Sequence, residues 1–194
     1  MSRLPGLVPA ALSDAQRELY SSIAEGPRAQ GPQHFALTAA DGSLNGPFNA
    51  FLYSPVLGNA IQELGAAVRY STALTDRTRE MAILIVAARW DSDFERHAHE
   101  SVGRAIGLTE DEIAELGVGR LPVLEDDHER ACAELTFALA DGDVNDAEWE
   151  RLRPILGDAT AFELSTLVGY YALLGLQLRA FRVEVPLDPF QENL

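Results

Sequence analysis

Two carboxylates and one histidine in this sequence have a spacing that could support proton transfer. Glu95 and His99 are four residues apart, so on a helix they share one face about one turn apart. A carboxylate in that position can accept a hydrogen bond from the imidazole, which fixes its tautomer and raises its basicity. Glu80 precedes the apolar run 81–88, where burying an unpaired carboxylate is costly. A tight turn near Asp91 would bring Glu80 toward His99, and the three groups could then act as a general acid and base.

The same segment has a simpler interpretation. Ser92 and Glu95 fit the Ser-x-x-Glu capping box that begins many helices. Asp91, Asp93 and Glu95 would also complement the positive end of the helix dipole, and Glu80 could pair with a neighbouring arginine. Local chemistry alone favours this structural interpretation over a catalytic one.

Other chemistries have weaker signals. His97 and His99 diverge on a helix because they are two residues apart, so no metal site is expected there. Cys132 falls on an apolar face, where thiols are usually inert. The chain has neither a glycine-rich phosphate loop nor a serine nucleophile elbow. Tyr170 and Tyr171 are expected in the core, although one phenol could reach the site. No cofactor is expected.

Composition restricts the partners. The 194 residues carry a formal net charge of −15, which should repel nucleic acid and anionic membranes. No apolar run is expected to serve as a signal sequence or to span a bilayer. The single cysteine excludes an internal disulfide and fits a reducing compartment, so a cytoplasmic protein with a small-molecule substrate is expected.

Helix signals dominate the chain, and no segment alternates long enough to build a sheet, so the class is all-α. Ser13 with Gln16, and Thr109 with Glu112, have capping-box spacing. The run 81–88 is apolar on every side and should occupy the centre of a bundle. A loop over residues 26–47 could contain a short hairpin around Asp41–Gly42.

Two further helices are expected on either side of the central run. Pro55 should open a helix whose apolar face carries four residues: Val56, Ala60, Leu64 and Ala67. Near the C-terminus, Pro154 should interrupt a short helix that precedes a long apolar one.

Residues 46–116 resemble the carboxymuconolactone decarboxylase family, which includes alkylhydroperoxidase D. The motifs are R-x-R-E at residues 77–80, the apolar helix, the segment "DFERHAH" and "AIGLTEDEI". The resemblance implies an all-α, alkylhydroperoxidase D-like helical bundle, with an N-terminal helix and loop over residues 1–45 and a helical domain over 46–194. It also implies a homo-oligomer, a trimer or hexamer. Helices apolar all round favour the same conclusion, because one chain cannot cover them fully.

The redox branch of that family carries the pattern E-x11-C-x2-C-x3-H, and Glu80, Ser92, Glu95 and His99 occupy these positions. Both thiols are absent, so thiol-dependent peroxide reduction is not expected. The decarboxylase-like branch instead commonly carries the pattern E-W-x-x-H. Glu95 and His99 fit this pattern, and Arg96 stands in place of the tryptophan.

The resemblance therefore favours catalysis by a cofactor-independent lyase of the decarboxylase type, acting on a small organic acid or lactone. His99 would be the general acid and base, oriented by Glu95 and paired with Glu80. Arg96, Arg89 and Ser92 would bind the anionic substrate. The alternative is a non-catalytic helical oligomer that binds small ligands or partners.

Overall fold

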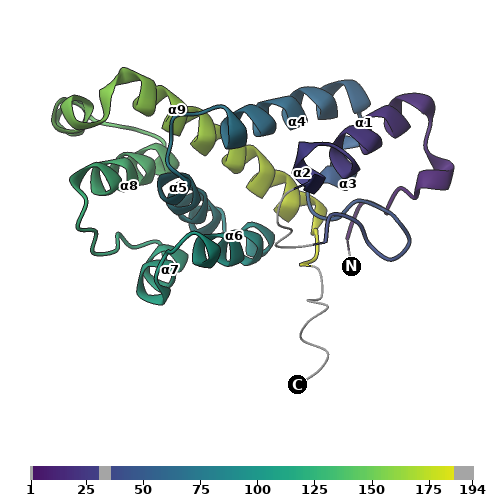
Figure 1. Ribbon diagram of the computed structural model, residues 1–194, viewed down its shortest axis with the longest axis horizontal. Coiled ribbons are helices and arrows are strands. Elements are labelled where there is room, and N and C mark those ends of the chain that lie inside the picture. The colour runs from purple at the N-terminus through teal and green to yellow at the C-terminus, as the bar shows by residue number, and fades with distance from the viewer. Residues whose placement is uncertain (1, 31–35, 186–194) are drawn as a thin grey trace. The chain divides into compact units, whose positions relative to one another are not determined.

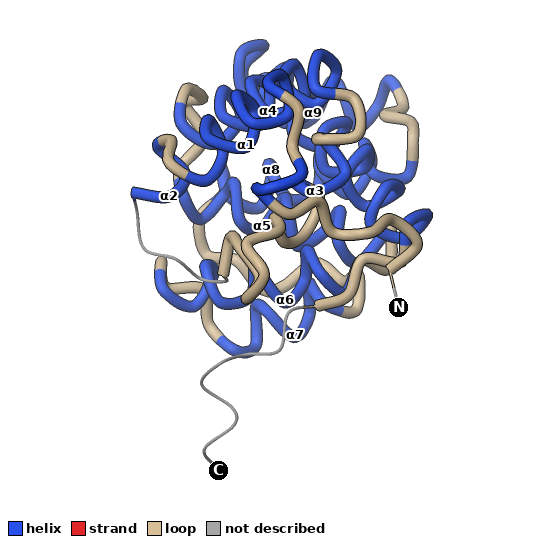
Figure 2. The backbone as a smooth tube through the Cα atoms, turned by 90° about the vertical axis from the view of Figure 1, so that its right-hand side faces the viewer, coloured by secondary structure: helices blue, strands red, loops and turns tan. Residues whose placement is uncertain are grey.

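The computed structural model describes residues 2–30 and 36–185, and over these residues the chain forms helices and loops without a strand (Figure 2). One antiparallel bridge, between Thr38 and Leu44, closes a turn at Gly42, where φ is 83°. The hairpin expected around Asp41–Gly42 is thus present in minimal form. Residues 31–35 of the expected long loop lie outside the described residues. The all-α class is confirmed for the described part.

The chain divides into two compact units, residues 1–67 with 177–194, and residues 68–176. The first unit contains η1 (Pro9–Ala11), α1 (Asp14–Ala24), α2 (Pro27–Gln30), α3 (Phe48–Phe51) and most of α4 (Pro55–Tyr70). The second contains α5 (Asp76–Arg89), α6 (Asp93–Ala105), α7 (Glu110–Gly117), α8 (Asp127–Asp141) and most of α9 (Asp146–Phe181). The division expected at residues 45 and 46 remains a prediction.

The capping signals read from sequence begin the helices as expected. At α1, the Ser13 side chain accepts from the Gln16 backbone N–H, and the Gln16 side chain accepts from the Ser13 N–H. Thr109 and Glu112 form the same reciprocal pair at α7. Each pair satisfies donors that the first helical turn leaves open, and α4 begins at Pro55 as predicted.

α5 occupies the centre of the second unit. It packs against α6, α7 and α8 (Figure 1), and its residues from Glu80 to Ala87 are all buried. Met81, Leu84 and Ile85 form a core with apolar residues that follow α6, belong to α7 or lie on α8. Because α5 is buried on every side, its apolar residues are not confined to one stripe.

The expected apolar face of α4 is exposed in the structure. Val56 is 88% exposed and Leu64 41%, and Ala60 and Ala67 are exposed as well. The buried side of the helix carries Gly58, Gly65 and Val68 instead. A Cβ at Gly58 would lie 2.3 Å from the Phe51 carbonyl oxygen, so close backbone approach, rather than apolar area, decides which side packs inward.

The expected interruption at Pro154 is corrected. Pro154 lies within α9, and the helix breaks three residues later at Gly157, where φ is 75° and ψ is 163°. Glycine adopts this left-handed conformation without steric cost. By length and composition α9 could cross a membrane, although the sequence analysis expected no such segment. Leu164, Leu167 and Tyr171 of α9 are buried within the protein, as in a core helix.

Candidate functional site

The connection between α5 and α6 positions the candidate site, and all of its residues belong to the second unit. Trp90, Asp91 and Ser92 join the two helices, with Asp91 in the left-handed region at φ 50°. The Ser92 backbone N–H donates to the Ala87 carbonyl at 2.9 Å, which completes the turn. The expected tight turn near Asp91 is therefore present, and it sets the two helices in contact.

This turn brings Glu80, Glu95 and His99 together. His99 Nδ1 lies 2.5 Å from Glu80 Oε2, and His99 Nε2 lies 3.3 Å from Glu95 Oε2. The side chain of His99 is 7% exposed, that of Glu80 1% and that of Glu95 5%. Tyr171 of α9 stands edge-on to the imidazole, with ring centroids 5.4 Å apart. One of the two tyrosines therefore does reach the site.

The two carboxylates favour the charged form of His99. Burial alone would lower the pKa of His99, but the charge of Glu80 and the hydrogen bonds of the imidazole to both carboxylates raise it above the ordinary value. Burial would likewise raise the pKa of Glu80, but the charge and hydrogen bond of His99, with Arg69 and Arg79, lower it overall. Both shifts favour an imidazolium paired with a carboxylate, a state in which Nδ1–H donates to Glu80 and Nε2–H donates to Glu95.

Two arginines that the sequence analysis did not single out complete the charged cluster. Arg69 Nη2 and Arg79 Nε each lie 4.0 Å from Glu80 Oε1. Arg69 also bonds the Tyr171 phenol; burial would lower its pKa, but Tyr171 and Glu80 raise it overall. Arg79 precedes Glu80 in the sequence, so the contact between the two residues could have been predicted from their adjacency. Arg69 lies on another helix, and no local pattern connects it to the site.

The arginines that were predicted to bind substrate lie on the protein surface. Arg96 is 47% exposed and bonds Asp93 at 3.1 Å, and Arg89 is 56% exposed and bonds Asp141 at 3.0 Å. Each bond runs to a surface carboxylate rather than to the Glu80–His99 pair. Their contacts give no support to a substrate role.

The capping box expected at Ser92 is absent, which corrects the sequence analysis. Ser92 is the N-cap residue of α6, but its side chain makes no capping hydrogen bond. Its hydroxyl is buried without a partner in the described chain. Glu95, the other half of the expected box, bonds His99 instead. Glu95 bonds the imidazole rather than the Ser92 backbone N–H, because a hydrogen bond to an ionised partner is stronger than one to a neutral backbone N–H.

Cys132 lies on α8 at 1% exposure, as the apolar face predicted. Burial raises the pKa of its thiol to about 12, so the attacking thiolate is scarce near neutral pH. Among the described residues, no group of three histidine, cysteine or acidic side chains is arranged to hold a metal ion.

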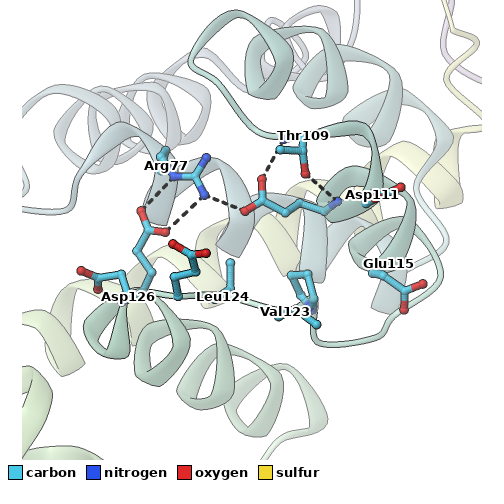
Figure 3. A pocket seen from close by; sticks show the side chains of 11 residues that line it. Arg77, Thr109, Asp111, Glu115, Val123, Leu124 and Asp126 are labelled. Atoms are coloured by element: carbon cyan, nitrogen blue, oxygen red, sulfur yellow. Dashed lines mark hydrogen bonds and ion pairs between the residues drawn. The ribbon is translucent and has the colours of Figure 1, made fainter.

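A cavity of about 690 Å³ lies elsewhere in the second unit (Figure 3). Acidic side chains dominate its lining, which includes Asp111, Glu115 and Asp126. Arg77 of α5 spans it, bonding Glu112 at 2.7 Å and Glu129 at 2.9 Å. These bonds tie α5 to α7 and α8. The cavity contains none of the predicted site residues.

Comparison with known proteins supports the fold and the family. Residues 55–138 match the carboxymuconolactone decarboxylase family, so the resemblance seen in the motifs is confirmed over this segment. The match includes Glu80, Glu95 and His99. No curated protein matches the sequence.

Solved structures share the fold. A peroxidase-related protein from Ralstonia eutropha JMP134, described as an alkylhydroperoxidase AhpD core, has a TM-score of 0.75 at 20% identity, covering 97% of this chain and 94% of that one. A peroxidase-related protein from Silicibacter sp. TM1040 has a TM-score of 0.73 at 14% identity, covering 94% and 91%. A protein of unknown function from Agrobacterium tumefaciens reaches 0.65 at 22%, covering 74% and 100%. The alkylhydroperoxidase D-like fold is confirmed.

Proposed function

We propose that this protein is a cofactor-independent acid/base lyase of the decarboxylase type that acts on a small organic acid or lactone. The observation that supports the proposal is the buried His99, bonded to Glu80 at 2.5 Å and to Glu95 at 3.3 Å. A histidine held between two carboxylates is a proton donor whose orientation is fixed on both sides. The match of residues 55–138 to the carboxymuconolactone decarboxylase family also supports the proposal.

The two nitrogens of His99 would have different roles in the reaction. The substrate's bond to its carboxylate carbon breaks, carbon dioxide leaves, and the electron pair is delocalised onto an adjacent carbonyl as an enolate. The carbon is then protonated from Nε2, the nitrogen with the longer bond to Glu95. Glu80 holds Nδ1–H throughout and stabilises the imidazolium. Solvent then reprotonates the imidazole, so one proton is consumed for each carbon dioxide released.

Glu95 must move for this step to occur. Its carboxylate lies against Nε2 and both side chains are almost fully buried, so a substrate reaches that nitrogen only when Glu95 swings aside. The structure would then be a closed form in which Glu95 protects the proton. General acid catalysis of this kind contributes roughly 10²–10⁴-fold to a rate.

The experiment that tests the proposal follows decarboxylation in deuterium oxide by NMR, over a panel of β-keto acids and carboxylated lactones. The wild type should release carbon dioxide from at least one member and place deuterium on the carbon that carried it. His99→Gln should reduce the rate by roughly 10²–10⁴-fold. Turnover unchanged in His99→Gln, with both proteins folded, would contradict the proposal.

A non-catalytic helical oligomer that binds small ligands is the second candidate. The observation that favours it is that both nitrogens of His99 are already bonded within a buried cluster, as in a structural ion pair. The NMR experiment separates the two candidates, because a structural pair would give no turnover and His99→Gln would mainly lower stability.

We also propose that the protein assembles as a homo-oligomer, a trimer or hexamer. The support is the exposed apolar face of α4, where Val56, Ala60, Leu64 and Ala67 are all exposed. Apolar surface gathered on one helix face is costly in water and typical of subunit contacts. A second copy of the chain is the proposed partner.

A further inference from the structure

The segment that connects α7 to α8 has a regular pattern of exposure. Leu121 is 39% exposed, Pro122 is buried, Val123 is 95% exposed and Leu124 is 6% exposed. Such alternation is typical of an extended chain, in which successive side chains point to opposite sides. The backbone N–H and C=O groups of alternate residues then lie on the same edge of the chain.

One edge of this segment is bonded to the protein and the other is open. The Leu124 carbonyl accepts a hydrogen bond from Arg130 Nη1 of α8 at 3.1 Å, and Pro122, on the same edge, has no N–H to donate. Neither the N–H nor the C=O of Leu121 or Val123 has a hydrogen-bond partner among residues 2–30 and 36–185. Unpaired backbone groups on one edge of an extended chain can accept an added strand.

The charges beside this edge are mostly negative. Val123 and Leu124 belong to the lining of the cavity of about 690 Å³, and Figure 3 shows them across it from Arg77. Six carboxylates line the cavity, and the one arginine of the lining is already bonded to two of them. Asp111 and Glu125 are exposed and form no hydrogen bond or ion pair within the described part of the chain.

We infer that residues 121–124 form a docking surface for an extended, basic peptide segment of a partner protein, which pairs with the open edge as an added strand. Main-chain hydrogen bonds to Leu121 and Val123 hold the peptide, as in other cases of strand addition. Its alternate side chains point to opposite faces, so basic residues reach the carboxylates while apolar residues cover Val123. Positive charge complements both the cavity lining and the net charge of −15.

The test titrates the full chain with three labelled peptides and follows their fluorescence anisotropy. The first is acetyl-Arg-Val-Arg-Val-Arg-amide, the second has glutamate in place of each arginine, and the third is the first with methylated backbone nitrogens. The first should bind, more weakly as salt rises, and should shift the NMR signals of the Leu121 and Val123 amides. The second should not bind. The third should bind about tenfold more weakly, because it cannot donate main-chain hydrogen bonds.

Val123→Pro removes one N–H from the open edge at a side chain that is 95% exposed, so the affinity for the first peptide should fall about tenfold. Val123→Thr, which keeps the N–H and the β-branched shape, should bind as the wild type does. If Val123→Pro fails to fold, Glu125→Gln serves instead and should weaken binding about two- to fivefold. Its control is Glu150→Gln, which removes an exposed carboxylate of α9 outside the cavity and should leave the affinity unchanged.

No binding of the first peptide, equal binding of the first and third peptides, or binding that leaves the Leu121 and Val123 amide signals in place would overturn the docking surface. Equal losses in a variant and its control would do the same. None of these measurements involves His99, so this inference and the proposed lyase activity fail separately.

Discussion

His99 is the residue whose protonation decides the chemistry of the site. Its two nitrogens meet two carboxylates from different positions, Glu80 on α5 and Glu95 one turn earlier on α6. An ordinary surface histidine loses its proton near pH 6.5, but the charge of Glu80 and the hydrogen bonds to Glu80 and Glu95 raise the pKa of His99 above that value. A raised pKa favours the imidazolium, the form that can protonate a carbanion.

At the same scale, Ser92 should not stabilise α6. Its hydroxyl is buried without a hydrogen bond, and an unsatisfied buried group costs about 1–3 kcal/mol. Ser92→Ala should therefore leave the free energy of unfolding in urea unchanged or raise it. Thr109→Ala, which removes a cap that is made, should lower it by about 1 kcal/mol. Equal losses in the two variants would show that Ser92 does cap the helix.

Cys132 should take no part in activity. The thiol is buried, and its pKa is raised to about 12 by burial and by Asp126 and Glu129. Cys132→Ser should keep the wild-type rate of decarboxylation, and neither protein should reduce hydroperoxides in a coupled thiol assay. Peroxide turnover in the wild type that disappears in Cys132→Ser would refute this account of the cysteine.

At the scale of elements, one glycine lets α9 approach the turn that builds the site. A Cβ at Gly175 would lie 3.0 Å from Trp90 Cβ, whereas one at Gly169 on the same helix meets nothing within 4 Å. Gly175→Val should lower the free energy of unfolding by about 1–3 kcal/mol through overpacking. Gly169→Ala should raise it by up to about 1 kcal/mol through helix propensity. A neutral Gly175→Val in thermal unfolding would mean that this contact is loose.

The elements also show what a sequence can and cannot specify. Capping boxes and the run 81–88 predicted α1, α5 and α7 because these signals are local. The spacing of Glu95 and His99, together with a tight turn near Asp91, predicted that Glu80 would lie close to both. Arg69 could not be predicted, since only the fold brings α4 residues to α5. The exposure of the apolar face of α4 could not be predicted, because apolar periodicity identifies a face and not whether the same chain covers it.

At the scale of the whole molecule, the exposed face of α4 predicts self-association. Ala60→Lys places a charge at the middle of that face on a good helix position, and it should shift the oligomer toward monomer in sedimentation at micromolar concentration. Val123→Lys adds the same charge at a residue that is 95% exposed in a loop, and should leave the mass unchanged. Both changes oppose the net charge of −15, so general repulsion cannot explain dissociation. A monomeric wild type would remove the proposal.

The charged pair also links the site to the stability of the whole chain. Because the pKa of His99 is raised, its contribution is fully present below the ordinary value of 6.5 and is lost as pH rises through the raised value. Because the pKa of Glu80 is lowered, its contribution is present above 4.5 and is lost as pH falls through the lowered value. The pair therefore stabilises the fold in the pH range between the lowered pKa of Glu80 and the raised pKa of His99.

The most direct test of the account is an NMR titration of the His99 imidazole in the folded protein. The account predicts that His99 titrates above 6.5 in the wild type and at a lower pH in Glu80→Gln, which removes the charge of its strongest partner. Glu112→Gln, which changes a carboxylate bonded to Arg77 instead, should leave the titration of His99 where it was. A wild-type His99 that titrates at or below its ordinary value, or one that is unaffected by Glu80→Gln, would contradict the claim that Glu80 and His99 form one proton-holding pair.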